Sequence, residues 1–69
     1  MNDILNDIIN EVQKEVARIK EMIAVSQILL QGQGKFAVHE ILIAEAERAI
    51  REQDKTVLVS ILPTLREIQ

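Results

Sequence analysis

The stretch LNDIINEVQKEVARIKEMIAVSQILL, residues 5–30, decides the fold because its aliphatic side chains recur with a heptad period. The spacings between successive members are four, three, four, three, four and seven, and Ser26 takes the core position inside the last gap. Side chains return to one line at this period only when a helix lies along another helix. The members of this heptad seam are Leu5, Ile9, Val12, Val16, Ile19, Ile23 and Leu30.

The seam predicts a first helix over about 3–31 and an antiparallel hairpin to a second helix. Residues 31–35, QGQGK, have the length and the glycine content of a turn between antiparallel helices. The second helix is expected over 35–53, because apolar residues recur there at helical spacing. Its inner face would carry Phe36, Ile43, Ala46 and Ile50, with Val38, Leu42 and Ala49 beside them.

A third segment, over 55–68, allows two interpretations. Asp54 is a good N-cap and the apolar residues after it recur at helical spacing, which predicts a short helix. Residues 56–62 are also rich in β-branched side chains, and Pro63 removes a backbone donor. A lone strand has no partner within the chain, so a helix broken or kinked near Pro63 is preferred. The alternative is a strand exchanged between chains.

The composition indicates one small helical domain over residues 1–69. The chain has no cysteine, and its 48% apolar share is high enough to drive folding, alone or with a partner. Its net charge of −3 argues against nucleic-acid binding, which needs a basic surface. The acidic start and the shortness of the apolar stretches predict neither a signal peptide nor a membrane span. We therefore expect a cytoplasmic protein.

His39 is the one residue that invites a metal or phosphoryl-transfer hypothesis. His39-Glu40 begins like the HExxH motif of zinc proteases, but Ile43 stands where the second histidine belongs. Residues 44–68 resemble the end of a histidine phosphotransfer domain, which would imply phosphorylation of His39. Leu42 and Ile43 replace the lysine and glycine of that family's signature. We expect an ordinary histidine near the hairpin turn.

Other polar patterns also lack a complete set of functional groups. Gly34-Lys35 resembles the end of a phosphate-binding loop, but the glycine required five positions earlier is Leu29. The acidic residues lie beside basic ones on the predicted solvent face, as in the i,i+4 pairs Glu47–Arg51 and Arg48–Glu52. We predict no catalytic residue, no cofactor and no metal site, and therefore a protein that is not an enzyme.

The remaining signal is an excess of apolar residues at the end of the first helix. Residues 22–30 are apolar around nearly the whole helix, and such a helix must be buried on all sides. Either the third segment covers this region, or a partner protein does. The predicted interface residues are Leu5, Ile9, Val12, Val16, Ile19, Ile23, Val25, Ile28, Leu29, Leu30 and Phe36.

These patterns favour a non-enzymatic helical interaction module. It would assemble with itself, most simply as a dimer, or join a heterologous helical partner as a subunit of a larger complex. The helix–Gly turn–helix outline of residues 1–53 resembles the small co-chaperones of bacterial type III secretion, which implies stabilisation of a partner protein. The alternative is a small regulatory protein, either an inhibitor of the immunity or antitoxin type, or a dimeric nucleic-acid-associated regulator whose basic face forms only in the dimer.

Overall fold

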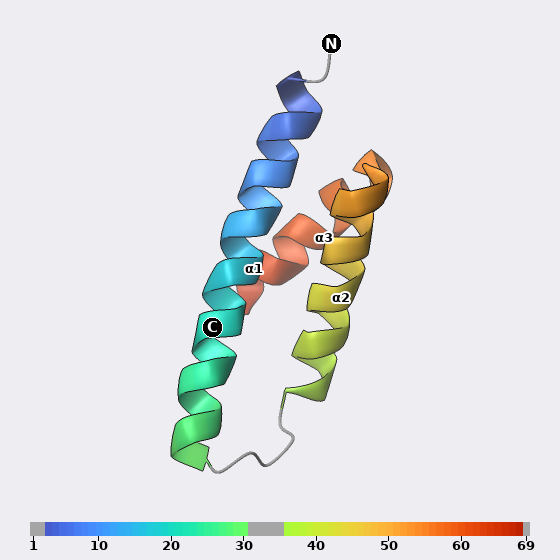
Figure 1. The fold of residues 1–69 in the computed structure, drawn as a ribbon. Helices are drawn as coiled ribbons and strands as arrows, with labels where there is room; N and C mark the ends of the chain where they lie inside the picture. The colour runs from blue at the N-terminus through green and yellow to red at the C-terminus, as the bar shows by residue number, and fades with distance from the viewer. Residues whose placement is uncertain (1–2, 31–35, 69) are drawn as a thin grey trace.

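The chain forms three α-helices in a computed structural model, which describes residues 3–30 and 36–68 (Figure 1). The all-α fold class is confirmed, and the three helices lie close to the predicted ranges. The turn predicted at 31–35 lies outside the described residues. The helices are α1 (Asp3–Leu30), α2 (Ala37–Glu52) and α3 (Lys55–Glu67).

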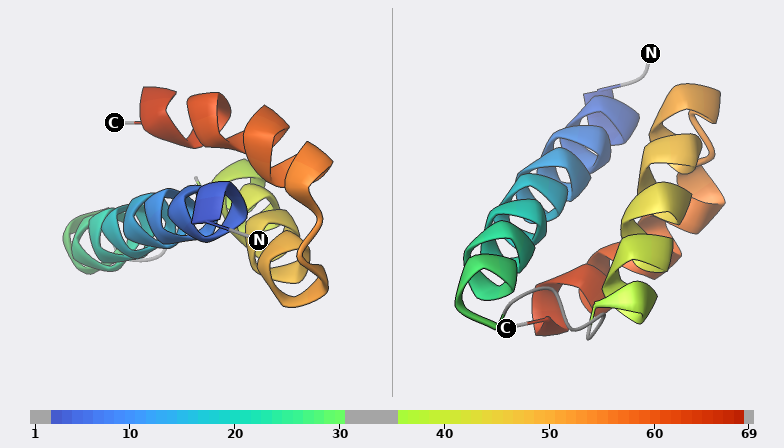
Figure 2. Two further views of the ribbon diagram at one scale, coloured as in Figure 1. Left: turned by 90° about the horizontal axis from the view of Figure 1, so that it is seen from above. Right: turned by 60° about the horizontal axis from the view of Figure 1, so that its bottom comes forward.

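The helices form two layers. α1 and α2 run antiparallel in one layer, and α3 crosses one face of both as the second layer (Figures 1 and 2). α1 and α3 pack most closely, whereas α1 and α2 contact each other least. The predicted hairpin is therefore held together largely through α3, which bridges its two arms.

A tight joint between α2 and α3 sets this crossing. Gln53 adopts the left-handed conformation with φ 53°, and the N–H of Asp54 donates to the carbonyl of Ala49 at 2.9 Å. This is the hydrogen bond that closes a Schellman C-terminal cap. The carboxylate of Asp54 then accepts from the N–H of Val57 at 3.3 Å, which confirms Asp54 as the N-cap of α3. Only Gln53 and Asp54 therefore separate the end of α2 from the start of α3.

The third segment is a helix despite its β-branched residues. Leu58, Ile61 and Leu65 are all buried, and only a helix places residues at spacings of three and four on one face. Burial against the other two helices therefore overrides local propensity. Pro63 lies inside α3, which continues through it without a break although Pro63 cannot donate to the carbonyl of Val59. A bend at Pro63 stays a prediction.

The core is aliphatic and draws on all three helices. No polar or charged side chain among the described residues is buried. Fully buried alanines at Ala46 and Ala49 leave room for side chains of the neighbouring helices to approach the α2 backbone closely. The buried core residues are Val12, Val16, Ile19, Ile23, Ile43, Ala46, Ala49, Leu58, Ile61 and Leu65.

Candidate interaction surface

The heptad seam lies mostly inside the chain's own core. Its central members are buried by α2 and α3, so the seam pairs helices within one chain. Leu5, Ile9 and Phe36 are half-buried and pack against that core. The assignment of these residues to an interface stays a prediction. Buried are Val12, Val16, Ile19 and Ile23; half-buried are Leu5, Ile9 and Phe36.

The last two turns of α1 carry the apolar excess that the sequence shows. Val25 is 52% exposed and Ile28 is 80% exposed, so neither is covered by α2 or α3. The side chains of Leu29 and Leu30, also predicted as interface residues, lie outside the described part of the chain. Of the predicted interface residues with described side chains, Val25 and Ile28 are therefore the two that face solvent.

The beginning of α2 adds two exposed residues that the sequence reasoning did not place in an interface. Val38 and Ile41 are each 67% exposed. The end of α1 and the beginning of α2 lie at the same end of the hairpin, as the antiparallel arms in Figure 1 show. We call the four exposed aliphatic side chains at this end, Val25, Ile28, Val38 and Ile41, the tip surface.

The tip surface is exposed for two reasons: its residues do not lie on the buried faces of α1 and α2, and α3 does not reach it. The guanidinium Nη2 of Arg18 donates to the carbonyl of Leu65 at 3.0 Å, which fixes the end of α3 beside the middle of α1. Figure 1 shows the same arrangement, with the red end of α3 at mid-height on α1. Met22 and Leu42, between this contact and the tip, are half-buried. Coverage therefore decreases along the hairpin toward its tip.

Charged residues become scarce toward the tip. The sequence has no Asp, Glu, Lys or Arg from position 22 to position 34, and none from 36 to 39. The ion pairs of α1 lie in its first two thirds: Glu15 contacts Arg18 at 2.8 Å, and Glu11 contacts Arg66 of α3 at 3.6 Å. The apolar end of the hairpin thus carries few charged residues, namely Lys35 and Glu40.

A local electrostatic effect is found on α2, beginning one helical turn beyond Ile41. Arg48 pairs with Glu45 and, at 2.7 Å, with Glu52, which confirms the predicted Arg48–Glu52 pair. The hydrogen bond from Arg48 lowers the pKa of Glu45 below its ordinary value, and the same bond raises the pKa of Arg48. These groups are solvent-exposed ion pairs on one helix, an arrangement that solvates α2.

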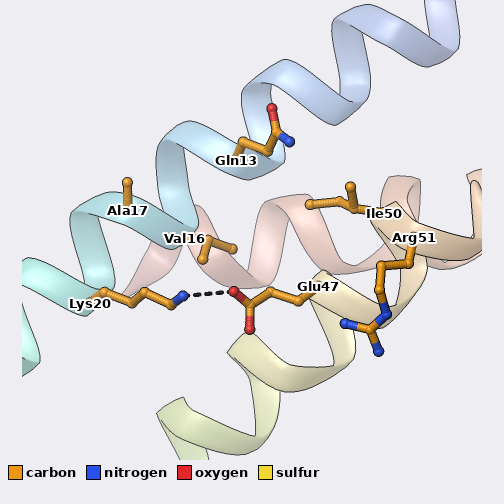
Figure 3. A pocket seen from close by; sticks show the side chains of 7 residues that line it. All are labelled: Gln13, Val16, Ala17, Lys20, Glu47, Ile50 and Arg51. Carbon is orange, nitrogen blue, oxygen red and sulfur yellow. Dashed lines mark hydrogen bonds and ion pairs between the residues drawn. The ribbon is translucent and has the colours of Figure 1, made fainter.

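An open cleft lies between α1 and α2 (Figure 3). It has a volume of about 480 Å³, and a smaller hollow of about 200 Å³ shares the Lys20 and Glu47 side chains with it. Lys20 Nζ and Glu47 Oε2 are 2.6 Å apart and join the two arms across the cleft, so Glu47 does not make the predicted pair with Arg51. The cleft is lined by Gln13, Val16, Ala17, Lys20, Glu47, Ile50 and Arg51.

His39 lies in the first turns of α2, beside the tip. Its ring is 5.4 Å from that of Phe36 at a tilt of 59°, an aromatic contact that holds both side chains against the hairpin. Its Nδ1 atom is buried and has no hydrogen-bond partner among the described residues. Both the interpretation of His39 as an ordinary histidine near the turn and a role in phosphoryl transfer stay predictions that the structure does not test.

The described residues hold no group of three or more His, Cys, Asp and Glu side chains placed to bind a metal ion. Within the same part of the chain, no helix has the length and apolar character needed to cross a membrane. In comparisons with known proteins, no family model, no curated protein and no solved structure matches this chain. Any functional conclusion therefore rests on the geometry of the chain itself.

Proposed function

We propose that this chain is a non-enzymatic helical interaction module that binds a protein partner through its tip surface. The observation that carries the proposal is the presence of four exposed aliphatic side chains at one end of the hairpin, where charged residues are few. Every other part of the three-helix arrangement supplies the rigid support that holds them there. Of the two arms, α1 contributes Val25 and Ile28, and α2 contributes Val38 and Ile41.

Burial of this surface is the physical driving force. Complete burial of an exposed Ile or Val side chain contributes on the order of 2 kcal/mol, so four of them supply about 8 kcal/mol toward an association cost of about 4–15 kcal/mol. Single exposed apolar side chains are ordinary on small proteins, whereas a group of them mostly marks a contact site. Residues on rigid helices are also held in place before binding, which reduces the ordering cost.

The charged faces give less support to a regulatory protein that recognises a basic partner. Many of the acidic side chains already have basic partners within the chain, including Glu15 with Arg18 and Glu47 with Lys20. Such paired carboxylates would have to exchange their partners in order to bind a basic surface. The tip surface needs no such exchange, and it is therefore the basis of the proposal.

Site-specific photo-crosslinking in the cells that produce the protein tests this function. A photoreactive phenylalanine analogue at position 28 or 41 should give one adduct of the same mass from both arms. The same analogue at exposed Glu52, at the other end of α2, is the control and should not give it. Excess unlabelled protein should compete for the adduct, and excess Ile28→Lys protein should not. The proposal is overturned if positions 28, 41 and 52 give equal yields, or if the tip positions give no adduct.

A further inference from the structure

We infer that the partner of the tip surface is a second copy of this chain, in a twofold contact between two hairpin tips. This inference rests on the proposed function and names its partner. In a contact of this kind each copy uses the same surface, so the tip must be complementary to itself. Three features of the chain support that arrangement: the scarcity of charge at the tip, the aliphatic chemistry of the tip and the extended shape of the whole chain.

Charge decides whether two identical surfaces can meet. The net charge of −3 repels a second copy, but most of the acidic side chains that cause it lie away from the tip, with exposed Glu40 beside Ile41 as the exception. From Met22 to His39 the sequence contains one charged residue, Lys35. Two tips can therefore approach without placing rows of like charges against each other, whereas contacts through the acidic faces would be repulsive.

The chemistry of the tip also selects the partner. Val25, Ile28, Val38 and Ile41 offer aliphatic surface and no side-chain hydrogen-bonding group, so the complementary surface must be equally apolar and uncharged. Interfaces between identical chains have this character more often than contacts between transient partners. The tip of a second copy meets this requirement, and it is present wherever the protein itself is present.

The chain is extended for its length, so it exposes more surface than a compact monomer does. The radius of gyration is 12.8 Å, whereas a compact domain of this length has about 11 Å. The accessible surface is 4828 Å², compared with about 4400 Å² for a compact monomer of the same mass. A stable interface buries about 800 Å² on each partner, so a contact confined to the tip would be modest. We therefore expect a dimer that dissociates in the micromolar range or above.

The test is the molar mass of the full chain in solution, measured by light scattering over a wide range of concentrations. Wild type should rise from 7.8 kDa toward twice that mass. Ile28→Lys should remain at 7.8 kDa throughout, because it places like charges on a self-complementary surface. Lysine near the C-terminal end of a helix is favourable, so the fold of the variant should persist. Ile41→Lys provides the same test from the other arm.

The matched control is Ile4→Lys, because Ile4 is 67% exposed on the same helix but at its opposite end. This variant should associate like wild type. The inference is overturned if wild type stays monomeric, if Ile28→Lys and Ile41→Lys still dimerise, or if Ile4→Lys weakens the dimer equally. If wild type is monomeric and its tip crosslinks to a different protein, the inference that the partner is a second copy is overturned. The proposed function would then still stand.

Discussion

The two halves of the hairpin contain the same kind of side chain and use it differently. In the half crossed by α3, aliphatic residues such as Ile19 and Leu58 are completely buried, and ion pairs surround them. In the tip half, Ile28 and Ile41 are exposed and charged residues are few, with Glu40 beside Ile41 as the main exception. The composition of an apolar stretch therefore does not decide whether it forms core or contact surface. Two factors decide it: the face of the helix on which a side chain lies, and the reach of the covering helix α3, which ends beside Arg18.

The largest effect on the free energy of unfolding is expected on α3, where two neighbouring residues differ in burial. Leu58 is 0% exposed and its neighbour Val59 is 49% exposed. Leu58→Ala should lower the free energy of unfolding by about 2–5 kcal/mol, because it removes contacts and leaves a cavity where three helices meet. Such a loss is comparable to the whole stability of so small a domain. Val59→Ala, the matched control, should change it by no more than about 0.5 kcal/mol.

Urea denaturation followed by far-UV circular dichroism measures both variants. If the two substitutions cost the same free energy, α3 does not cover the hairpin in the way described, and the distinction between the covered half and the tip is lost.

A smaller effect is expected at the joint that directs α3 across the hairpin. Asp54→Ala removes the acceptor for the N–H of Val57 and should cost about 1 kcal/mol of unfolding free energy. Ser60→Ala, at an exposed position within α3, is the control and should be neutral or slightly stabilising. The melting temperatures of the three proteins at one concentration provide the comparison. Equal values for Asp54→Ala and wild type would show that the cap does not hold α3 in place.

The smallest expected effect concerns acid and the charged face. Because Arg48 lowers the pKa of Glu45 in the folded chain, this pair contributes stability above the ordinary carboxyl pKa of 4.5 and loses it as the pH falls through the lowered value. Glu45→Gln should therefore lose less stability than wild type on acidification. Thermal melts at a series of pH values measure the difference, with Glu21→Gln on α1 as the control. Parallel curves for wild type and Glu45→Gln would rule out the contribution.

Much of this fold could be predicted from the sequence because its signals are local. The heptad spacing predicts α1, and Asp54 predicts the start of α3. The burial of the seam within one chain could not be predicted, because a heptad period is the same for helices of one chain and of two. Helical periodicity, the N-cap at Asp54 and the lack of a partner strand favoured a helix for α3, whereas its position across both arms depends on the joint at Gln53.

Two of the four tip residues were among the interface residues predicted from the sequence, and the other two were not. The apolar excess of residues 22–30 identified Val25 and Ile28, whereas Val38 was expected beside the inner face of the second helix. Val38 is exposed because α3 ends before it, and the length of that coverage is a tertiary property. Ile41 could have been recognised, since it lies two residues from Ile43 and therefore well away from the inner face of a helix. The Lys20–Glu47 pair joins two helices, and no sequence spacing indicates it.

The most direct test of the account is the solvent exposure of individual methyl groups, measured by NMR with a soluble paramagnetic agent at low and high protein concentration. The methyl signals of Val25, Ile28, Val38 and Ile41 should broaden strongly in dilute solution and become protected as the concentration rises. Those of Val12, Ile19 and Leu65 should stay protected at both concentrations, because they are buried within one chain. Broadening of the core methyl signals, or tip signals unaffected by concentration, would contradict the account.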